Sequence, residues 1–340
     1  MRVRGSGIAV PSCPTPDGPK DVVTNADMLG VLGYGELSLR KQQAMQRMIA
    51  ASGGQRRHWS HWVGSEARED EATAIDLATE AASAALRDAG LQASDLDLVI
   101  LALNTSPMAT LPSASPLCAR LGYMGPSFDL KAGCAGSVYS LQWAAMSLAN
   151  GYRRVLVVGS DTMSKYVDAQ ALSGFLNVGD GAGALVLEAA PEPNFACLLG
   201  GEYSTWDHAG VFGSMPPRQA DIDSGAFYYR GAPTQTRDLV VARYRDGLQE
   251  LVARTQVGMD ELALWIPHQV SLPILQDVHR SLGRPDLRMV TTIERYGNTG
   301  AASLLMALHE VRHERPEGWC ALSALGGGMR WGSALWKGWT

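Results

Sequence analysis

Long apolar segments are absent from this chain of 340 residues. No stretch approaches the roughly 18 consecutive apolar residues that mark a transmembrane helix, so we expect no membrane partner. The opening residues, MRVRGSGIAVPSCPTP, contain too short an apolar run for a secretory signal. These two absences favour a soluble cytoplasmic protein.

Dense basic clusters are absent as well. The formal net charge is -5, and no stretch rich in lysine and arginine is interleaved with aromatic residues, as phosphate-binding surfaces usually are. We therefore expect no nucleic-acid partner.

Cysteine is scarce and scattered. The chain has 5 cysteines, an odd number, with no CxxC spacing. This pattern argues against a disulfide framework and against a zinc site, so we expect no bound metal. Most of these thiols should be inert core residues. They are Cys13, Cys118, Cys134, Cys197 and Cys320.

Apolar residues are plentiful: 46% of the chain is hydrophobic and only 19% is charged, which predicts a large buried core. Apolar runs bounded by turns predict strands, and helical periodicity predicts helices between them, which indicates an α/β protein. The expected strands are residues 97–104, 154–160, 183–189, 263–268 and 320–326. The expected helices are residues 71–90, 135–151, 237–255, 271–283 and 299–314.

The order of these elements occurs twice, with an offset of about 165 residues, which is far longer than a solenoid repeat. We interpret this as a duplicated α/β half, with residues 1–190 forming the first half and residues 191–340 the second. The alternative is that the chain is not duplicated, because the order strand, helix, strand recurs in any α/β protein. Residues 30–70 interrupt the pattern as an insertion near a site mouth, and residues 203–235 as a long surface or lid loop.

Cys134 lies in the segment DLKAGCAGSVYSL, directly after a predicted short strand and at the first turn of a predicted helix. Unpaired backbone N–H groups and the helix dipole should lower the pKa of a thiol in that position and favour the nucleophilic thiolate. The alternative is a buried structural thiol in a tight strand-to-helix connection.

His268 and Asn298 are candidates for the same site. His268 ends a predicted strand in WIPHQ, at the edge where open α/β sheets bind ligands, and Asn298 opens a helix in the turn YGNTG. A core histidine and an ordinary helix cap are the alternatives. If the halves are duplicated, Cys134 and Asn298 occupy corresponding helix starts and the three residues converge.

A cysteine with a histidine and an asparagine fits acyl transfer through a thioester, with the two partners donating hydrogen bonds to a carbonyl that becomes anionic. A cysteine protease uses the same residue types, but no protease signature surrounds them here. The segments GDGAGALVLE (residues 179–188) and ALGGGMRWGSALW (residues 324–336) each place glycines just before a predicted strand, but they lack the features of a P-loop or a dinucleotide fingerprint. We interpret them as turns that line the site.

The chain resembles the β-ketoacyl-ACP synthase III family of condensing enzymes over nearly its whole length. The resemblance implies a thiolase-like fold with duplicated α/β halves in a layered α-β-α-β-α architecture, a homodimer and no cofactor. The matching motifs are VTNADM, DLATEAASAALRDAG, DLKAGCAGSVYSL, LVVGSDTMS, NVGDGAGALVL, IPHQ, ERYGNTGAAS and ALGGGMRWGSAL.

The resemblance also implies roles for individual residues. Cys134 matches the acyl-accepting nucleophile, and His268 and Asn298 match the pair that holds the carbonyl of a malonyl thioester while it loses carbon dioxide. The backbone N–H groups of Cys134 and Gly327 match the oxyanion hole. Leu111 matches a position that reaches across the dimer to close the partner's acyl pocket.

Some positions depart from the family pattern. Ser271 stands where the family has a second asparagine, which shortens or removes a hydrogen bond behind the substrate site. Leu172 stands where an arginine contacts the nucleotide of CoA, and residues 51–54 lack another such arginine. These changes favour an acyl-carrier protein or an unusual thioester as donor over acetyl-CoA. Three arginine pairs are candidates for contact with a carrier, with a solvated surface position as the alternative for each. They are Arg56 and Arg57, Arg153 and Arg154, and Arg243 and Arg245.

Three functions remain open from the sequence. The first is an acyltransferase that condenses the acyl group of Cys134 with a malonyl-type thioester in polyketide or other specialised fatty-acid-derived metabolism. The second passes the acyl group to a hydroxyl, amine or carrier thiol without forming a carbon–carbon bond. The third is a non-catalytic partner subunit of another synthase.

Overall fold

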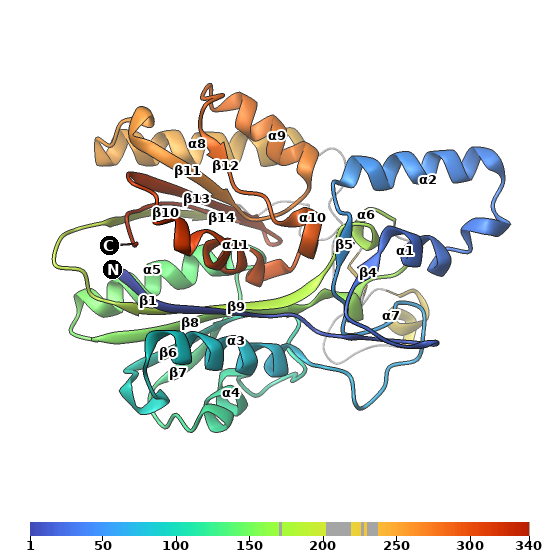
Figure 1. Cartoon of the computed structure of the whole chain (residues 1–340), viewed down its shortest axis with the longest axis horizontal. Coiled ribbons are helices and arrows are strands. Elements are labelled where there is room, and N and C mark those ends of the chain that lie inside the picture. The colour runs from blue at the N-terminus through green and yellow to red at the C-terminus, as the bar shows by residue number, and fades with distance from the viewer. Residues whose placement is uncertain (170–171, 202–218, 226–227, 230–236, 340) are drawn as a thin grey trace.

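Two five-stranded mixed sheets form the centre of the computed structural model, which describes residues 1–169, 172–201, 219–225, 228–229 and 237–339 (Figure 1). The first sheet has the order β1-β9-β8-β6-β7 and the second the order β10-β14-β13-β11-β12. In each sheet the first and last strands in the sequence are antiparallel neighbours, and the two strands farthest from them are parallel to each other. The two sheets therefore have the same topology, which confirms the duplicated fold.

The first sheet consists of β1 (Arg2–Ala9), β6 (Leu98–Ala102), β7 (Ser127–Leu130), β8 (Arg154–Thr162) and β9 (Asp180–Glu188). The second consists of β10 (Phe195–Gly201), β11 (Leu262–Pro267), β12 (Arg288–Met289), β13 (Trp319–Gly326) and β14 (Arg330–Trp336). All strands and helices predicted from apolar patterns are present, within a few residues of the expected bounds.

Helices form three layers around the sheets (Figure 1). Helices α5 (Gly136–Ala149) and α11 (Ser303–Val311) lie between the sheets and share one apolar core with both. Helices α3 (Ala74–Ala89) and α4 (Ala114–Leu121) cover the outer face of the first sheet. Helices α8 (Arg237–Thr255) and α9 (Leu272–Ser281) cover the outer face of the second. The predicted α-β-α-β-α layering is therefore confirmed.

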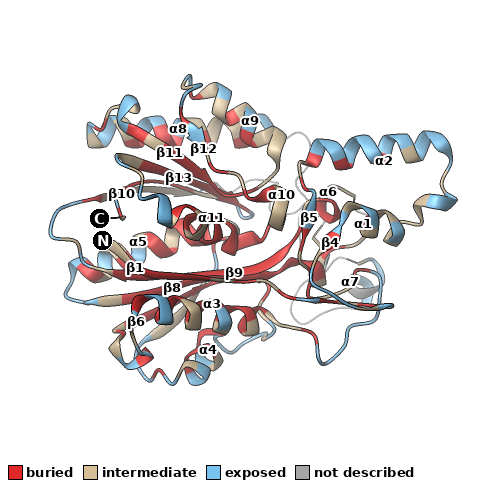
Figure 2. Cartoon of the chain, in the orientation of Figure 1, coloured by how far each residue is buried: buried red, intermediate tan, exposed pale blue. Residues whose placement is uncertain are grey.

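Burial explains the composition of the central layer (Figure 2). Helix α11 carries five consecutive side chains with no exposed surface, because sheets flank it on both sides. A helix that is apolar all round can be stable only in such a position. The five are Leu304, Leu305, Met306, Ala307 and Leu308.

Strand β1 was not expected from the sequence, because its residues RVRGSGIA form no apolar run. Its glycines have a packing role: a Cβ at Gly5 would lie 2.3 Å from the backbone oxygen of Ala85, and one at Gly7 would lie 2.4 Å from that of Ala81. Only glycine permits helix α3 to approach the strand this closely.

Shorter elements occur at one end of the molecule (Figure 1). Helix α2 extends outward there and is largely exposed (Figure 2). The predicted loop at 203–235 falls mostly outside the described residues. No described helix is long and apolar enough to span a membrane. The short elements are β2 (Cys13–Thr15), β3 (Gly18–Lys20), β4 (Val23–Thr24), α1 (Asn25–Val31), α2 (Leu39–Ser52), β5 (Arg56–Arg57), α6 (Leu172–Phe175), α7 (Gln219–Asp223) and α10 (Ile293–Tyr296).

Candidate active site

Cys134 lies in the connection between β7 and α5, two residues before the helix begins. Gly133 adopts φ +57°, a left-handed conformation that side chains rarely tolerate, so the chain can turn sharply just before the thiol. Cys134 keeps part of its surface accessible. The position is therefore a turn that presents the thiol at the inner end of the central helix.

The glycine-rich turn after β13 packs directly against this connection. A Cβ at Gly326 would lie 2.2 Å from the backbone nitrogen of Cys134, and a Cβ at Gly133 would lie 2.8 Å from the nitrogen of Gly327. The backbones of the two halves meet here with no room for side chains. The amides of Cys134 and Gly327 are thus on neighbouring segments, as an oxyanion hole requires.

His268 follows β11 directly and is 1% exposed. Its backbone N–H donates to the Ser323 carbonyl at 2.7 Å, which continues the pairing of β11 with β13. Its Nδ1 lies 2.5 Å from the Ser303 hydroxyl. This contact fixes the ring, and Nε2 makes no hydrogen bond within the described part of the chain.

Asn298 lies in the turn that leads to α11 and is 6% exposed. Its backbone N–H donates to the Asn177 carbonyl at 2.6 Å, and its own carbonyl accepts from the N–H of Gly179 at 3.0 Å. The side-chain Oδ1 accepts from the Gly300 N–H at 3.0 Å. The amide nitrogen Nδ2 has no hydrogen-bond partner among the described residues and is available as a donor.

The turn from Asn298 to Ser303 connects the three candidates. Ser303 contacts His268, and a Cβ at Gly136, two residues after Cys134, would lie 3.5 Å from the Cβ of Ala301. The segments that carry the thiol, the imidazole and the amide therefore converge, although the residues are far apart in the sequence.

Asp161 on β8 holds this turn to the first half. Its buried carboxylate accepts from the Ala301 N–H at 2.7 Å, and also from the backbone and side chains of Asn104 and Thr105. Burial raises the pKa of this carboxyl, while the donated hydrogen bonds act in the opposite direction. Sequence reasoning missed Asp161 and Ser303, because neither residue type nor spacing signals a contact that forms only between the halves.

The expectation of a lowered thiol pKa at Cys134 was wrong. Desolvation by the surrounding packing, and next the nearby Asp161 carboxylate, raise the pKa of Cys134 to about 12. The start of α5 lies in a dense interior, where the loss of hydration outweighs the favourable N–H groups. Burial also raises the pKa of Cys197 to about 12, so location and neighbours, not acidity, distinguish Cys134.

Burial lowers the pKa of His268 to about 3, so the imidazole is neutral at ordinary pH. The ring faces Ser303 and no carboxylate contacts it among the described residues. A neutral ring of this kind suits a hydrogen-bond donor to a developing oxyanion. It is a poor general base, because an effective base needs a pKa near the working pH.

Two further predicted site residues lie outside this convergence. Leu111 is 67% exposed, on the loop between β6 and α4. Ser271 immediately precedes α9, and its side chain makes no capping hydrogen bond. Both assignments to substrate binding remain predictions.

The suggestion that Arg57 contacts a carrier was wrong. Its side chain has no exposed surface and donates to the Leu176 carbonyl and to Oδ1 of Asn25. Burial lowers its pKa to about 10. Arg57 joins β5 to the segment before β9, and its role is structural.

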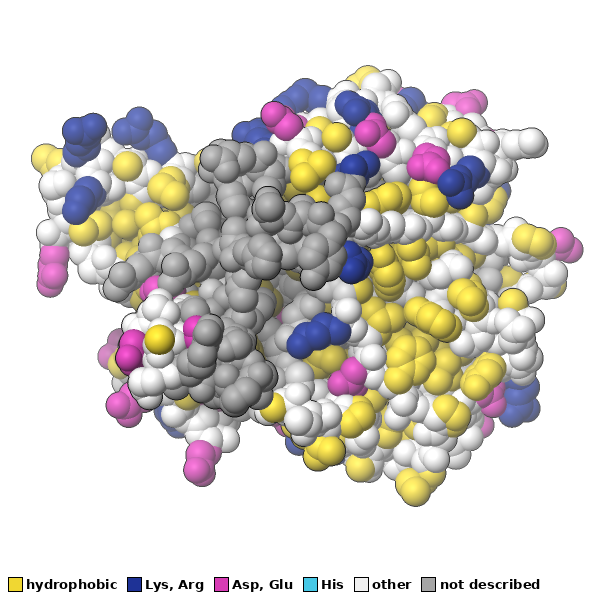
Figure 3. Space-filling model, turned by 180° about the vertical axis from the view of Figure 1, so that it is seen from behind, with side chains coloured by type: hydrophobic (Ala, Val, Ile, Leu, Met, Phe, Trp, Pro, Cys, Tyr) yellow, Lys and Arg dark blue, Asp and Glu magenta, His cyan; other side chains and the backbone are white. Residues whose placement is uncertain are grey.

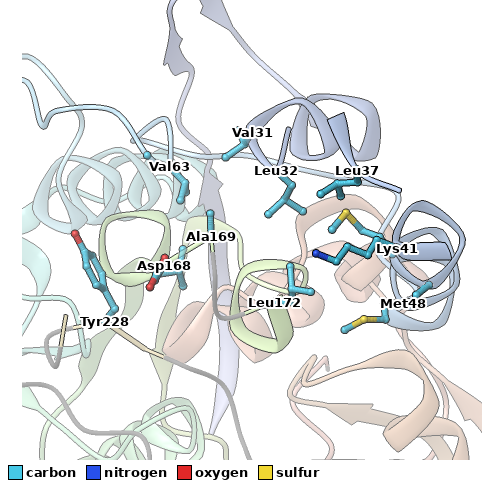
Figure 4. A pocket seen from close by; sticks show the side chains of 14 residues that line it. Val31, Leu32, Leu37, Lys41, Met48, Val63, Asp168, Ala169, Leu172 and Tyr228 are labelled. Atoms are coloured by element: carbon cyan, nitrogen blue, oxygen red, sulfur yellow. The ribbon is translucent and has the colours of Figure 1, made fainter. Parts of the chain in front are cut away.

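A cleft of about 800 Å³ lies between α1, α2 and the segment that carries Leu172 (Figure 4). Its lining is mainly apolar, and Lys41 is the one basic residue among those that line it. Val167 also lines the cleft, and it forms an isolated parallel β-bridge with Tyr229. The phenol of Tyr229 lies within electrostatic range of Cys134. Residues of the segment 30–70 thus form one wall of this cleft, and its placement near the mouth of the active site remains a prediction.

Duplicated sheets that meet around a central pair of helices define the thiolase-like class of enzymes. Within that class, family models for 3-oxoacyl-[acyl-carrier-protein (ACP)] synthase III match residues 128–201, and for its C-terminal region residues 252–338. The β-ketoacyl-[acyl-carrier-protein] synthase III of Aliivibrio fischeri is 34% identical over 332 residues, which cover 91% of this chain and 98% of the relative. The chain therefore belongs to the β-ketoacyl-ACP synthase III family and is an acyltransferase.

Solved structures agree with this assignment. The 3-oxoacyl-(acyl carrier protein) synthase III of Pseudomonas aeruginosa PAO1 is 29% identical with a TM-score of 0.82, covering 98% of this chain and 97% of that one. The corresponding enzyme of Aquifex aeolicus VF5 is 27% identical with a TM-score of 0.80, covering 98% of both chains. The fold is shared over 98% of this chain.

Proposed function

We propose that Cys134 accepts an acyl group from a thioester donor and that this acyl group then condenses with a malonyl-type thioester. In the first stage a bond forms between Sγ and the acyl carbon, the donor's carbon–sulfur bond breaks, and the thiol proton passes to the leaving thiol. In the second stage the malonyl group loses carbon dioxide, its enolate attacks the acyl carbon, and the Cys134 sulfur leaves and regains a proton.

The observation that carries this proposal is the convergence of the Cys134 connection, the Gly327 turn and the neutral His268–Asn298 pair. Loss of carbon dioxide generates the enolate without a strong base, so the partners need only donate hydrogen bonds to it. His268 can donate through Nε2 when Nδ1 accepts from Ser303, and Asn298 can donate through Nδ2. A protease role would instead require His268 as a general base, which its low pKa opposes.

The donor in this proposal is an acyl-carrier protein or an unusual CoA thioester. Leu172 lines the cleft, at the position where the family resemblance implies an arginine that contacts the nucleotide of CoA, and the lining of that cleft is mainly apolar. An apolar lining favours a ligand with little charge. We further propose a role in specialised metabolism, in polyketide or fatty-acid-derived pathways, in the cytoplasm.

We also propose that the chain forms a homodimer. Within each chain, residues 1–190 form the first half and residues 191–340 the second. Strand β7 is an edge strand of its sheet, and the described residues place no strand on its outer side. Exposed apolar side chains occur near it, with Trp143 47% and Leu111 67% exposed. Figure 3 shows hydrophobic side chains gathered on one face of the molecule. A second copy would cover such an edge.

Intact-protein mass spectrometry tests the first stage. The purified protein is incubated with a panel of acyl-CoA and acyl-carrier-protein thioesters, with Cys134→Ala as the control. We expect the wild type alone to gain the mass of one acyl group. If no donor modifies the wild type, or if Cys134→Ala is modified equally, Cys134 is not the acyl acceptor.

A second candidate function transfers the acyl group to a hydroxyl, amine or carrier thiol without condensation. The departure at Ser271, behind the expected substrate site, leaves this function open, whereas retention of His268 and Asn298 favours condensation. The product mass after addition of a malonyl-carrier thioester separates the two functions, because a β-keto product contains two extender carbons. A product that contains only the donor's acyl group would contradict condensation.

A further inference from the structure

Tyr244 on α8 has a buried hydroxyl that finds no hydrogen-bond partner among the residues that the structure describes. The residue is 3% exposed, and its phenol oxygen lacks a partner in the described part of the chain. Other tyrosines differ: the hydroxyls of Tyr123 and Tyr139 donate to backbone carbonyls, and that of Tyr296 donates to Glu310. A buried polar group without a partner loses its hydrogen bonds to water and gains none within the protein. Its presence therefore needs a physical explanation.

Packing places the Tyr244 ring behind the active site. The ring meets Trp265 edge-on, with centroids 6.3 Å apart, and the Trp265 indole donates to Ser323. Leu325 and Met329, which flank the glycine-rich turn, belong to the same apolar cluster as Tyr244. That turn contacts the backbone of Cys134.

The Tyr244 phenol lies within electrostatic range of the Cys134 thiol. Burial raises the pKa of Tyr244, and Cys134 raises it further. The Leu325 backbone acts in the opposite direction but makes no hydrogen bond of normal geometry with the phenol. The hydroxyl therefore keeps its proton at every working pH and is a hydrogen-bond donor.

A second phenol lies close to the same thiol. Tyr229 is held by its backbone N–H, which donates to the Tyr166 carbonyl, and Cys134 raises its pKa after burial does. Two phenol rings thus lie near Cys134. A pocket for an unsubstituted alkyl chain would need only aliphatic side chains as its lining. A phenylalanine at position 244 would keep the ring packed on Trp265 without desolvating a hydroxyl.

We propose that Tyr244 determines substrate specificity: its hydroxyl donates a hydrogen bond to an oxygen of the acyl chain carried by Cys134. The preferred donors are then acyl thioesters whose chain bears a keto or hydroxyl group, over alkyl chains of the same length. The inference rests on the proposed function, because it requires an acyl group on Cys134. The acyl chain then supplies the hydrogen-bond acceptor that the Tyr244 hydroxyl lacks among the described residues.

Competition loading tests this inference. The donors are pantetheine thioesters with acyl chains from butyryl to octanoyl. Each unsubstituted acyl thioester is mixed with the thioester of the same chain length that bears one keto or hydroxyl group, and the masses of the acyl-enzymes are compared. We expect the wild type to favour one oxygenated chain by about 10-fold, the effect of one hydrogen bond, and Tyr244→Phe to lose that preference. Loading by the alkyl partner should stay within about two-fold, because the ring remains.

Controls separate the possible failures. Tyr152→Phe makes the same chemical change at a residue that is 36% exposed and should keep the wild-type preference. Tyr244→Phe should unfold at the wild-type temperature or above it, since it removes an unpartnered hydroxyl. A wild type that loads neither these thioesters nor any acyl-CoA or acyl-carrier-protein donor contradicts the proposed function itself. A wild type that loads donors without favouring an oxygenated chain, or a preference that survives in Tyr244→Phe, overturns the role of Tyr244.

Discussion

At the scale of single residues, burial sets the protonation of both reactive groups. It raises the pKa of Cys134 to about 12 and lowers that of His268 to about 3, so both are neutral near pH 7. For His268 the neutral form is favoured in the folded state. Its contribution to stability is therefore complete above the unfolded pKa of about 6.5 and declines as the pH falls from there toward 3.

The raised thiol pKa predicts how alkylation of Cys134 depends on pH. Below its pKa the thiolate fraction of a thiol rises about tenfold per pH unit, so reaction with iodoacetamide should keep accelerating across the alkaline range. An ordinary thiol, with a pKa of about 8.5, would level off soon above that pH. The rate is measured by peptide mass mapping, with Cys134→Ala to identify the peptide. A plateau at or below pH 8 would show that the site stabilises the thiolate.

Some residues of the site could be predicted from the sequence and others could not. Cys134, His268 and Asn298 stand beside glycine or proline at junctions between strands and helices, where a side chain can point out of a sheet. Their roles remain predictions that the geometry supports. Asp161 and Ser303 have no such local signal. The direction of the Cys134 pKa shift depends on packing by the second half, which local helix electrostatics does not include.

At the scale of elements, the active site depends on a close approach between two backbones. The turn after β13 meets the connection before α5 at Gly326, where a Cβ would lie 2.2 Å from the Cys134 nitrogen. The next residue, Gly327, has no atom within 4 Å of its Cβ position. Adjacent glycines in one turn therefore differ sharply in the space available to them.

This difference predicts opposite results for two alanine substitutions. Gly326→Ala should lower the free energy of unfolding by about 1–3 kcal/mol and impair acyl loading, because Cys134 must shift. Gly327→Ala should leave stability nearly unchanged and keep the backbone N–H available to an oxyanion. Thermal unfolding and acyl-enzyme mass measure the two effects. Equal behaviour of the two variants would contradict the close contact at Gly326.

Elements with apolar runs were predictable, whereas β1 was not. Strand β6 is buried along its whole length, so its sequence LVILA carries a clear signal. Strand β1 depends on glycines that admit helix α3, and glycine is a poor strand former in isolation. Its pairing with β9 is set by tertiary packing between residues far apart in the chain.

At the scale of the whole molecule, duplication was readable because each half repeats the same order of strands. The interior position of α11 fits its apolar sequence, and the two central helices share one core with both sheets. What the sequence did not define is the outer surface around β7. Its edge is unpaired within the described residues, and its four side chains are all half-buried.

The proposed dimer predicts different effects for two exposed leucines. Leu111 is 67% exposed on the loop after β6, and Leu39 is 76% exposed on α2, away from the sheet edge. If Leu111 enters the partner subunit, Leu111→Asp buries a charge at the interface. The dissociation constant of the dimer, measured by sedimentation, should then rise at least 10-fold. Leu39→Asp should sediment as the wild type does.

Acyl loading at high protein concentration then separates assembly from pocket closure. If Leu111 also closes the partner's acyl pocket, Leu111→Asp should load acyl chains more slowly than the wild type even where both are dimeric, because a carboxylate disfavours an apolar chain. Normal loading by the dimeric variant would restrict Leu111 to the interface. A wild type that sediments as a monomer at every concentration would contradict the dimer itself, and the open edge of β7 would then need protection by other means.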